Sequence, residues 1–369
     1  MNDMSGGPAL DERPADSSFS FTGNWREFLP IALTNFALTI VTLGFYRFWA
    51  KARERRYLWS RTHFIDDAFE WTGTGKEMFL GFLIVAAVLM PLILFVNFGF
   101  QAMVLRGQAA LAGAILLTLY VGFFYLYHVA KFRALRYRLS RTWWHGIRGG
   151  SDAPGWDYGW KGLWKSAAGW AVFGFLVPWS MTQLWNDRWN RMSFGGHPFK
   201  ADAHENGLMR RWLLLYLVPV LSLVIFAIAL GIAFATPGMA SEEGGAPTAA
   251  AIASFVLGIF MVYGLILLFG LSFYALFFRQ VAAATRVGGL SFVFTARTRD
   301  WLRLILGNIG LVIATLGVGL LFLSYRNWAF VVRHMEASGV VDLDLLTQST
   351  ARAPTDAEGL ADAFDFGAV

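Results

Sequence analysis

The chain of 369 residues contains no cysteine. A disulfide framework, a thiolate metal site, an iron–sulfur cluster and a cysteine nucleophile are therefore all excluded. Charge is also scarce, because only 31 Lys or Arg and 25 Asp or Glu make up 15% of the residues, where soluble domains average about a quarter. A water-soluble globule of this size needs a more polar surface, so the apolar residues require another environment.

The apolar residues are gathered into long windows that contain no Asp, Glu, Lys or Arg. A charge-free stretch of about 18 residues or more is long enough to cross a bilayer as a helix. We therefore predict an all-α polytopic membrane protein. The windows are 28–46, 78–105, 107–130, 166–186, 212–241, 244–278 and 304–325.

The two ends of the chain are polar and mostly acidic. We predict a disordered N-terminal arm over 1–18 and a disordered acidic tail over 341–369. No apolar stretch precedes Phe28, so we expect no cleaved signal peptide. The first apolar segment would then direct the chain to the membrane.

Internal repeats are the next feature. Residues 19–44 align without a gap to 292–317, and residues 51–62 align to 131–142. A weaker similarity surrounds Trp189. On this basis we predict a first repeat unit over 19–155, a second over 156–284 and a third, partial one over 285–340.

Each repeat combines the same local patterns. An alternating FxFT segment precedes an apolar helix, which is interrupted at Thr42-Leu43-Gly44 or, in the middle copy, at Val177-Pro178. Short cytoplasmic β-hairpins are predicted to turn at Asp66-Asp67, Gly195-Gly196 and Gly288-Gly289, and Gly149-Gly150 is predicted to be a turn. The expected fold is thus all-α, with pseudo-repeated broken helices and short hairpins.

Positive charge predicts which side of the membrane each connection occupies. Lys and Arg concentrate in 51–77, 131–165, 187–211 and 279–303, which predicts that these segments are cytoplasmic. Segment 187–211 would be external if all seven windows crossed. We therefore predict two true hairpins, 78–130 and 212–278, and three re-entrant or broken segments, 28–46, 166–186 and 304–325, with both termini cytoplasmic. Simple crossing by all seven windows remains the alternative.

The repeats also carry a family resemblance. The segments FSFTGNWREF, TNFALTIVTLGFYRFWAKARERRYLWSRT and KFRALRYRLSRTWWHGIR, with the closing repeat, resemble the YjgN-like family of bacterial inner-membrane proteins over roughly residues 19–336. The resemblance implies a bacterial inner (cytoplasmic) membrane location with several membrane passes. It supplies no catalytic or binding residue, because the family is defined by a domain of unknown function. The middle copy departs from the pattern at Val177-Pro178-Trp179.

Two sets of residues are candidate binding positions. Basic, aromatic-rich helices are typical of surfaces that contact anionic lipid, and their simplest role is to anchor at headgroups and set topology. The sharper hypothesis is a headgroup or anion site lined by Lys51, Arg53, Arg56, Lys131, Arg133 and Arg136. Asn35 and Asn308 occupy equivalent repeat positions in apolar helices, where they serve either as packing contacts between helices or as the polar lining of a broken-helix interface.

Other candidates are weaker. His128 lies near a window end and is interpreted as interfacial. His197 and His204 match no metal-ligand spacing, so no metal and no cofactor are predicted. The basic segments flank apolar windows, which favours anionic membrane lipids as partners and not nucleic acid.

Two functions remain open. The first is a membrane protein that binds or transports a small hydrophobic or anionic solute or a lipid. The second is a structural or regulatory membrane protein whose basic helices organise anionic lipid or recruit partner proteins. An enzyme is the least favoured reading, because no P-loop, GxSxG or HExxH motif and no cluster of catalytic side chains is present.

Overall fold

The computed structural model describes residues 18–235, 249–339, 347–349 and 351. The predicted arm over 1–18 and the predicted tail over 341–369 lie almost wholly outside the described residues. Described residues of the tail contact the body, since Arg148 Nη2 donates to Ala351 O at 2.6 Å and Gln348 Nε2 donates to Gly146 O at 2.9 Å.

A strand, a pair of helices and a second strand recur along the chain, and we call each such group a unit. The units are: first, β1 (Phe19–Phe21), α1 (Trp25–Val41), α2 (Arg47–Ser60) and β2 (Thr62–Phe64), followed by β3 (Asp67–Ala68); second, β4 (Glu70–Trp71), α3 (Gly75–Leu94), η2 (Phe95–Gly99), α4 (Phe100–Leu105), α5 (Ala109–Arg141) and β5 (Thr142–Trp144); third, β6 (Ile147–Gly150), α6 (Trp156–Ala171), α7 (Val177–Trp189) and β7 (Ser193–Phe194); fourth, β8 (His197–Ala201), α8 (Leu208–Leu213), η3 (Leu214–Tyr216), α9 (Leu217–Ala235), α10 (Ala249–Ala283) and β9 (Thr285–Val287); fifth, β10 (Leu290–Phe294), α11 (Thr298–Ala314), η4 (Val318–Phe322), α12 (Leu323–Arg333) and β11 (Met335–Ser338). The predicted division into three units at 155 and 284 stays a prediction about the sequence.

The strands of all units pair into two antiparallel sheets. One sheet has the order β11-β10-β9-β8-β7-β6-β5-β4 and the other β1-β2-β3. The sheets are joined through Phe69 between β3 and β4, and the first and last strands approach where Ala337 N donates to Ser18 Oγ. We call β1 to β11 the strand ring. Helices of membrane-crossing length are present, as predicted, but the term all-α does not cover these two sheets.

Two-residue turns connect each unit to the next. They lie at 65–66, 145–146, 195–196 and 288–289, and each contains a residue with positive φ, as tight hairpins require. The predicted turns at Gly195-Gly196 and Gly288-Gly289 are confirmed, and the first turn lies one residue earlier than predicted. The prediction for Gly149-Gly150 is wrong, because both glycines lie in β6 and pair with Phe194 and Ser193.

The three windows predicted to be broken form short helical hairpins. Each reverses at two consecutive residues with positive φ: Leu43-Gly44, Phe173-Gly174 and Leu316-Gly317. Glycine adopts this conformation readily and ends a helix. The predicted break at Val177-Pro178 is wrong, because Pro178 lies in the first turn of α7, where its missing N–H costs no helical hydrogen bond.

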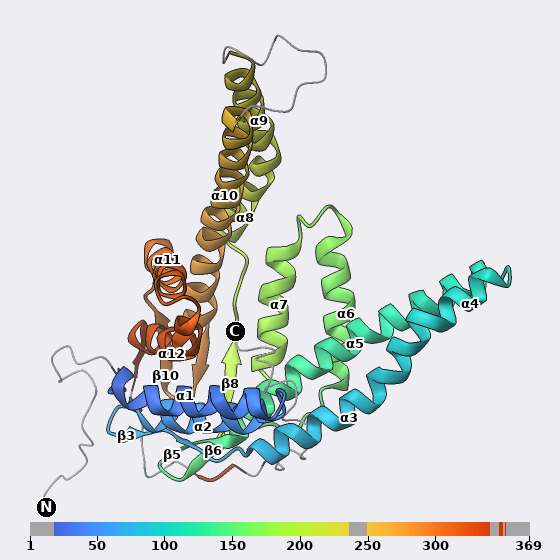
Figure 1. The fold of residues 1–369 in the computed structure, drawn as a ribbon. Coiled ribbons are helices and arrows are strands. Elements are labelled where there is room, and N and C mark those ends of the chain that lie inside the picture. Colours follow the sequence, from blue (N-terminus) through green and yellow to red (C-terminus); the bar gives the residue numbers. More distant parts are fainter. Residues whose placement is uncertain (1–17, 236–248, 340–346, 350, 352–369) are drawn as a thin grey trace, which may run out of the picture.

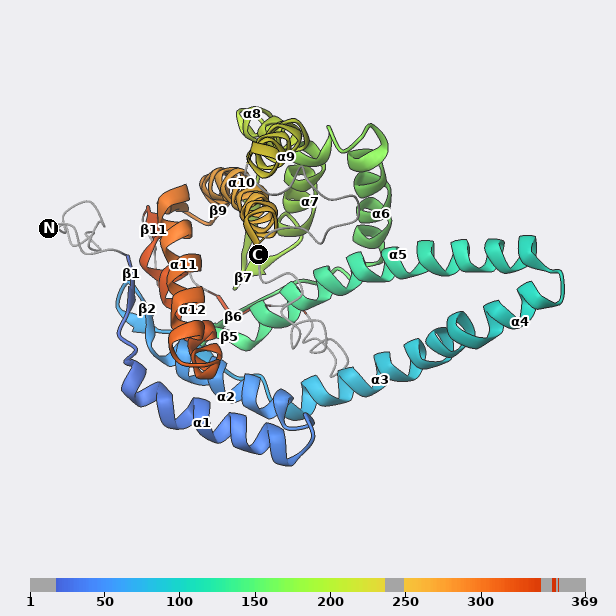
Figure 2. The same ribbon diagram turned by 45° about the horizontal axis from the view of Figure 1, so that its top comes forward.

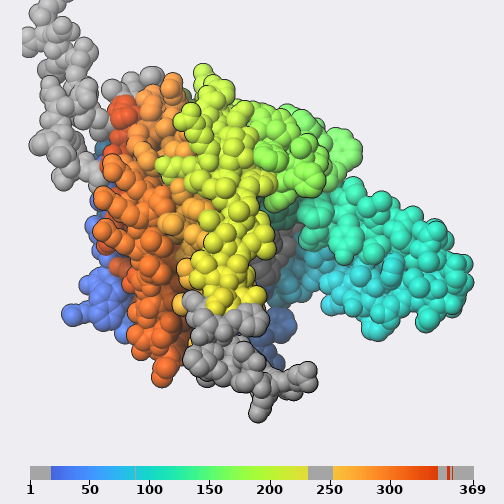
Figure 3. Space-filling view, turned by 90° about the horizontal axis from the view of Figure 1, so that it is seen from above, coloured from blue at the N-terminus to red at the C-terminus, as the bar shows by residue number. Residues whose placement is uncertain are grey.

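Two units carry longer and more apolar helices. Among the described residues, four helices are long and apolar enough to cross a membrane: Gly75–Leu105, Ala109–Arg141, Leu208–Gly231 and Ile252–Ala283. They form two hairpins that leave the strand ring in different directions, with α3 to α5 projecting well away from the body (Figures 1, 2 and 3). The helices return to adjacent strands of the ring in every unit.

Candidate binding site

A central cavity of about 660 Å³ lies inside the strand ring. Ligand sites for small molecules typically have about 300–1,000 Å³ and a mostly apolar lining with few polar groups. Strands from every unit and helices α2, α5, α7, α10, α11 and α12 contribute to its wall. The cavity is therefore a product of the whole ring and not of one repeat.

Period-two alternation explains the aromatic wall. Successive side chains of a strand point to opposite faces, so residues two apart share a face. Phe292 and Phe294 of β10 both line the cavity, as this alternation requires. The same alternation directs Phe64 and Trp144 inward, where their ring centroids lie 5.0 Å apart.

Three tryptophans of the short hairpins each attach their own unit to the next one around the ring. Trp59 Nε1 donates to Thr142 Oγ1 at 2.9 Å, and Trp185 Nε1 donates to Thr285 Oγ1 at 3.0 Å. The third bond closes the ring, since Trp328 Nε1 of the last unit donates to Thr62 Oγ1 of the first at 2.9 Å. Each threonine begins a strand, and all six residues line the cavity.

Only two charged residues, both basic, are among those that line the cavity in the described chain: Arg138 and Arg188. Arg188 is 5% exposed, and its Nε and Nη1 atoms are buried without a hydrogen-bond partner. Its guanidinium lies 5.5 Å from the ring centroid of Trp185. Burial lowers the pKa of Arg188, Tyr158 opposes that effect, and Arg138 lowers the pKa further.

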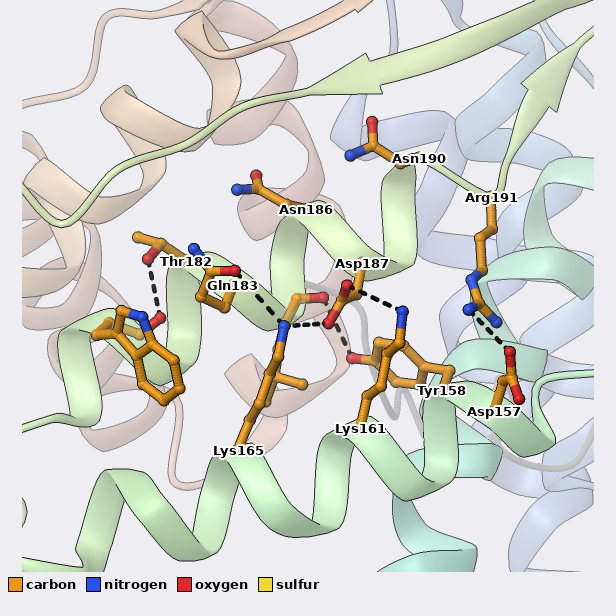
Figure 4. Close-up of polar contacts among 12 residues, drawn as sticks. Asp157, Tyr158, Lys161, Lys165, Thr182, Gln183, Asn186, Asp187, Asn190 and Arg191 are labelled. Carbon is orange, nitrogen blue, oxygen red and sulfur yellow. Dashed lines mark hydrogen bonds and ion pairs between the residues drawn. The ribbon is translucent and has the colours of Figure 1, made fainter.

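The side chains of α7 explain how Arg188 is directed inward. Asn186 and Asn190 each bind β8 or the residues just after it: Asn190 Nδ2 donates to Ala201 O at 2.9 Å and Asn186 Nδ2 to Ala203 O at 2.9 Å, while both side-chain oxygens accept from the same residues' N–H groups. Asp187 points the opposite way, toward α6 (Figure 4). Arg188 is consequently left on the face that lines the cavity.

The carboxylate nearest in sequence is already occupied. Asp187 Oδ2 is 2.5 Å from Lys165 Nζ, and Asp187 Oδ1 is 3.7 Å from Lys161 Nζ, as Figure 4 shows. Arg191, one turn along, pairs with Asp157 at 3.0 Å. Arg188 is thus the cation of this helix pair that has no acidic partner among the described residues.

The predicted basic residues occupy two different settings. Arg53 and Arg56 are exposed on α2, and Lys51 is half-buried. Arg133 and Arg136 belong to the C-terminal end of α5, which is one continuous helix with the apolar span, and they bind the loop before α6: Arg133 Nε donates to Pro154 O at 3.2 Å and Arg136 Nη1 to Ala153 O at 2.7 Å. Lys131 is half-buried in the same part of α5.

Asn35 and Asn308 each bind within their own helical hairpin. Asn35 Nδ2 donates to Ala50 O at 3.2 Å, which joins α1 to α2. Asn308 joins α11 to α12, because its Nδ2 donates to Asn327 Oδ1 at 3.0 Å and its Oδ1 accepts from Arg326 Nε at 2.7 Å. Neither asparagine is among the cavity-lining residues.

The histidines lie apart from one another. His197 lines the cavity, whereas His204 is an exposed residue 3.4 Å from Asp202 Oδ1. His128 Nε2 lies 3.1 Å from Ser166 Oγ, so it contacts α6. Within the described ranges no group of three or more His, Asp or Glu is placed to hold a metal ion.

Sequence reasoning missed Arg188 as a site residue. It counted the arginine with the basic segment 187–211 as a topology signal. The local indication was its position between Trp185 and Trp189 on a helix that ends at a strand of the ring. Nothing in the sequence showed that Asp187 turns away from it.

A ring of strands with two hairpins of membrane-crossing length, built around an apolar cavity, defines a helical membrane protein of repeated units. The chain belongs to the family described as "Bacterial protein of unknown function (DUF898)", which it matches over residues 16–363. This confirms the resemblance seen in the repeats.

Two relatives share parts of the sequence. The chain is 37% identical over 65 residues to Inner membrane protein YjgN of Salmonella typhimurium, covering 18% of this chain and 16% of that protein. It is 31% identical over 132 residues to Inner membrane protein YjgN of Escherichia coli O157:H7, covering 36% of this chain and 30% of that protein. The matches therefore span less than a third of either relative. No solved structure matches the chain.

Proposed function

We propose that this chain is a multi-pass protein of the bacterial inner membrane that binds a small hydrophobic or anionic solute, or a lipid, in its central cavity. The observation that carries the proposal is the 660 Å³ cavity lined almost entirely by aromatic and aliphatic side chains. In an apolar cavity of this size, each Å² of apolar ligand surface removed from water contributes about 25 cal/mol of favourable free energy to binding. The names of the relatives support the membrane assignment.

The hairpins support a topology with the strand ring and both termini on the cytoplasmic side. In this arrangement α3 to α5 and α8 to α10 cross the membrane, and the three short hairpins enter and return. Large apolar residues at the short tips support membrane contact, since Leu43 is 90%, Phe173 87% and Leu316 95% exposed. Because the two long hairpins diverge, a shared bilayer requires them to tilt in opposite directions.

The absence of cysteine makes this topology directly testable. Single cysteines replace Gln108, in the exposed loop between α4 and α5, and Lys200, which is exposed on β8. An impermeant thiol reagent applied to intact spheroplasts should label Q108C and leave K200C unlabelled until the membrane is opened. Labelling of K200C in intact spheroplasts would instead support crossing by all seven windows.

Occupancy of the cavity is tested by photo-crosslinking. A diazirine-bearing fatty alcohol is applied to the purified full chain, and modified peptides are mapped by mass spectrometry. We expect adducts on cavity residues such as Phe292, and the cavity-filling Val287→Phe should lower their yield about tenfold, because overpacking costs on the order of 1–3 kcal/mol. Val121→Phe, on the exposed face of α5, is the matched control.

One pattern of adducts would reject cavity binding. Adducts confined to the lipid-facing surfaces of α3, α5, α9 and α10, with equal yield in V287F and V121F, would show that the alcohol only dissolves around the protein.

A second function rests on the exposed arginines of α2. Arg53 and Arg56 suit contact with anionic headgroups, each basic residue near such a surface contributing about 1 kcal/mol. In this second function, contact between these arginines and lipid headgroups would fix the orientation of the strand ring relative to the membrane. It is compatible with a ligand in the cavity.

A further inference from the structure

We propose that the central cavity binds a single-chain amphiphilic anion, with its carboxylate or phosphate headgroup on Arg188 and its alkyl chain among the aromatic side chains. This inference rests on the proposed function, because it specifies the ligand class of the same cavity. It adds a headgroup site that neither the family nor its named members assign.

The first step is the charge of Arg188. Buried cations in proteins are nearly always paired, because removal from water is costly without a compensating anion. The other cations around α7 follow this rule, since Lys165 pairs with Asp187 and Arg191 with Asp157. Arg188 has an aromatic ring as its neighbour and no acid among the described residues. An anionic group on a ligand would pair with Arg188.

The second step is the kind of polar group left unsatisfied around it. Trp189, the next residue, also lines the cavity, and its buried indole N–H has no acceptor. Trp301 on the opposite helix pair has the same unsatisfied donor. Arginine and indole nitrogens only donate. A matching ligand therefore carries acceptor oxygens, and a planar guanidinium favours carboxylate or phosphate.

A second basic residue reinforces this preference. Arg138 of α5 lines the same wall and is close enough to Arg188 to act on it electrostatically. Both side chains place positive charge on the same part of the wall, which favours an anionic over a neutral ligand group there. No acidic residue is among the cavity-lining residues that the structure describes.

The third step is the remainder of the cavity. Away from the arginines the wall consists mainly of Phe, Trp, Leu and Val side chains from β8 to β11 and from α10 to α12. An apolar ligand body gains there by leaving water. A volume of about 660 Å³ suits one alkyl chain with its headgroup and not a complete two-chain phospholipid. The ligand class is consequently a fatty acid or a single-chain phosphate monoester.

The experiment is a binding titration of the full chain by native mass spectrometry. The probes are palmitate, palmitoyl lysophosphatidate and the uncharged monopalmitoylglycerol, which share one alkyl chain and differ in headgroup. Wild type should show one saturable site. At least one anionic probe should bind at least about tenfold more tightly than the neutral one, because its headgroup accepts a hydrogen bond from the charged guanidinium. The tighter of the two anions identifies carboxylate or phosphate as the source.

Three variants complete the test. Arg188→Gln should reduce affinity for the anions about tenfold and leave the neutral probe within about twofold. Arg286→Gln, an exposed arginine on β9, is the matched control and should change neither. Arg188→Lys keeps the charge without the planar fork and should retain the preference for anions, which keeps the test decisive if R188Q does not fold.

The failures separate the two proposals. The headgroup site would be overturned, and cavity binding left intact, if all three probes bound equally well. The same conclusion would follow if R188Q bound the anions and the neutral probe as tightly as wild type does. Absence of any saturable site in wild type would overturn both.

Discussion

The exceptional residue of this protein is Arg188, a buried cation without a buried anion. The cations nearby, Lys165 of α6 and Arg191 just after α7, have their own acidic partners, so the charge of Arg188 is not part of an ion-pair network. In the ligand-free protein its burial is a cost to folding, and a protein can keep such a cost where a site needs it.

Replacement of Arg188 should therefore stabilise the empty protein. We expect Arg188→Met to raise the free energy of unfolding by about 1–3 kcal/mol, because an uncompensated charge is removed and an apolar side chain fills its place. The measurement is the thermal unfolding midpoint of delipidated protein in detergent. Arg286→Met, at an exposed position, should leave the midpoint within the scatter of wild type. A lower midpoint in R188M would mean that the guanidinium is structural.

At the scale of elements, α7 is the part that positions the site. Two asparagines attach it to β8 through paired hydrogen bonds, and Asp187 attaches it to α6. The side-chain amide of asparagine has both a donor and an acceptor, so it can bind the C=O and the N–H of one backbone residue. Each asparagine thus makes the pair of hydrogen bonds that a neighbouring strand would otherwise make. The helix is thus held on two sides while its third side lines the cavity.

Loss of one attachment should loosen the helix. Asn190→Ala leaves the N–H and C=O of Ala201 without their partners, which should cost about 1–3 kcal/mol. Hydrogen exchange should reveal faster exchange of the Ala201 amide than in wild type. The matched variant Asn206→Ala, at an exposed loop residue, should leave that amide protected. Unchanged exchange in N190A would argue against this role of α7.

The tips of the short hairpins are a second element with a definite expectation. If Leu43 and Leu316 enter the hydrocarbon region, nitroxide labels at L43C and L316C in a bilayer should collide more often with oxygen than with a polar nickel complex. A label at K200C, on the strand ring, should show the reverse order. Preferential collision of both tip labels with the nickel complex would place the tips in water.

At the scale of the whole molecule, the bond between the last and first units holds the ring closed. Trp328 reaches Thr62 across most of the chain, and the indole of Trp328 stacks on that of Trp59 at a centroid distance of 4.1 Å. Trp328→Phe keeps an aromatic ring but loses the hydrogen bond, so we expect a loss of about 1 kcal/mol in thermal unfolding measurements. Trp164→Phe, at a residue 51% exposed, is the control. Equal midpoints for both variants would show that stacking alone closes the ring.

The sequence by itself determined the features that depend on local pattern. Charge-free length predicts the four helices that are long and apolar enough to cross a membrane, and Gly-Gly pairs predict two of the hairpin turns, because both follow from near neighbours in the chain. The repeats indicated a shared unit and the family. The break of the middle hairpin was misplaced, since Val177-Pro178 is the more visible signal while Phe173-Gly174 makes the turn.

Only the tertiary structure decided how those parts combine. The strands pair in chain order, but the ring closes only where Ala337 of the last unit meets Ser18 before the first strand, a contact across most of the chain that no local pattern specifies. The same distant contacts enclose the cavity and decide that Asp187 binds Lys165, leaving Arg188 alone on the inner face. Whether a charge is paired depends on which helix packs beside it, and packing is set by the fold as a whole.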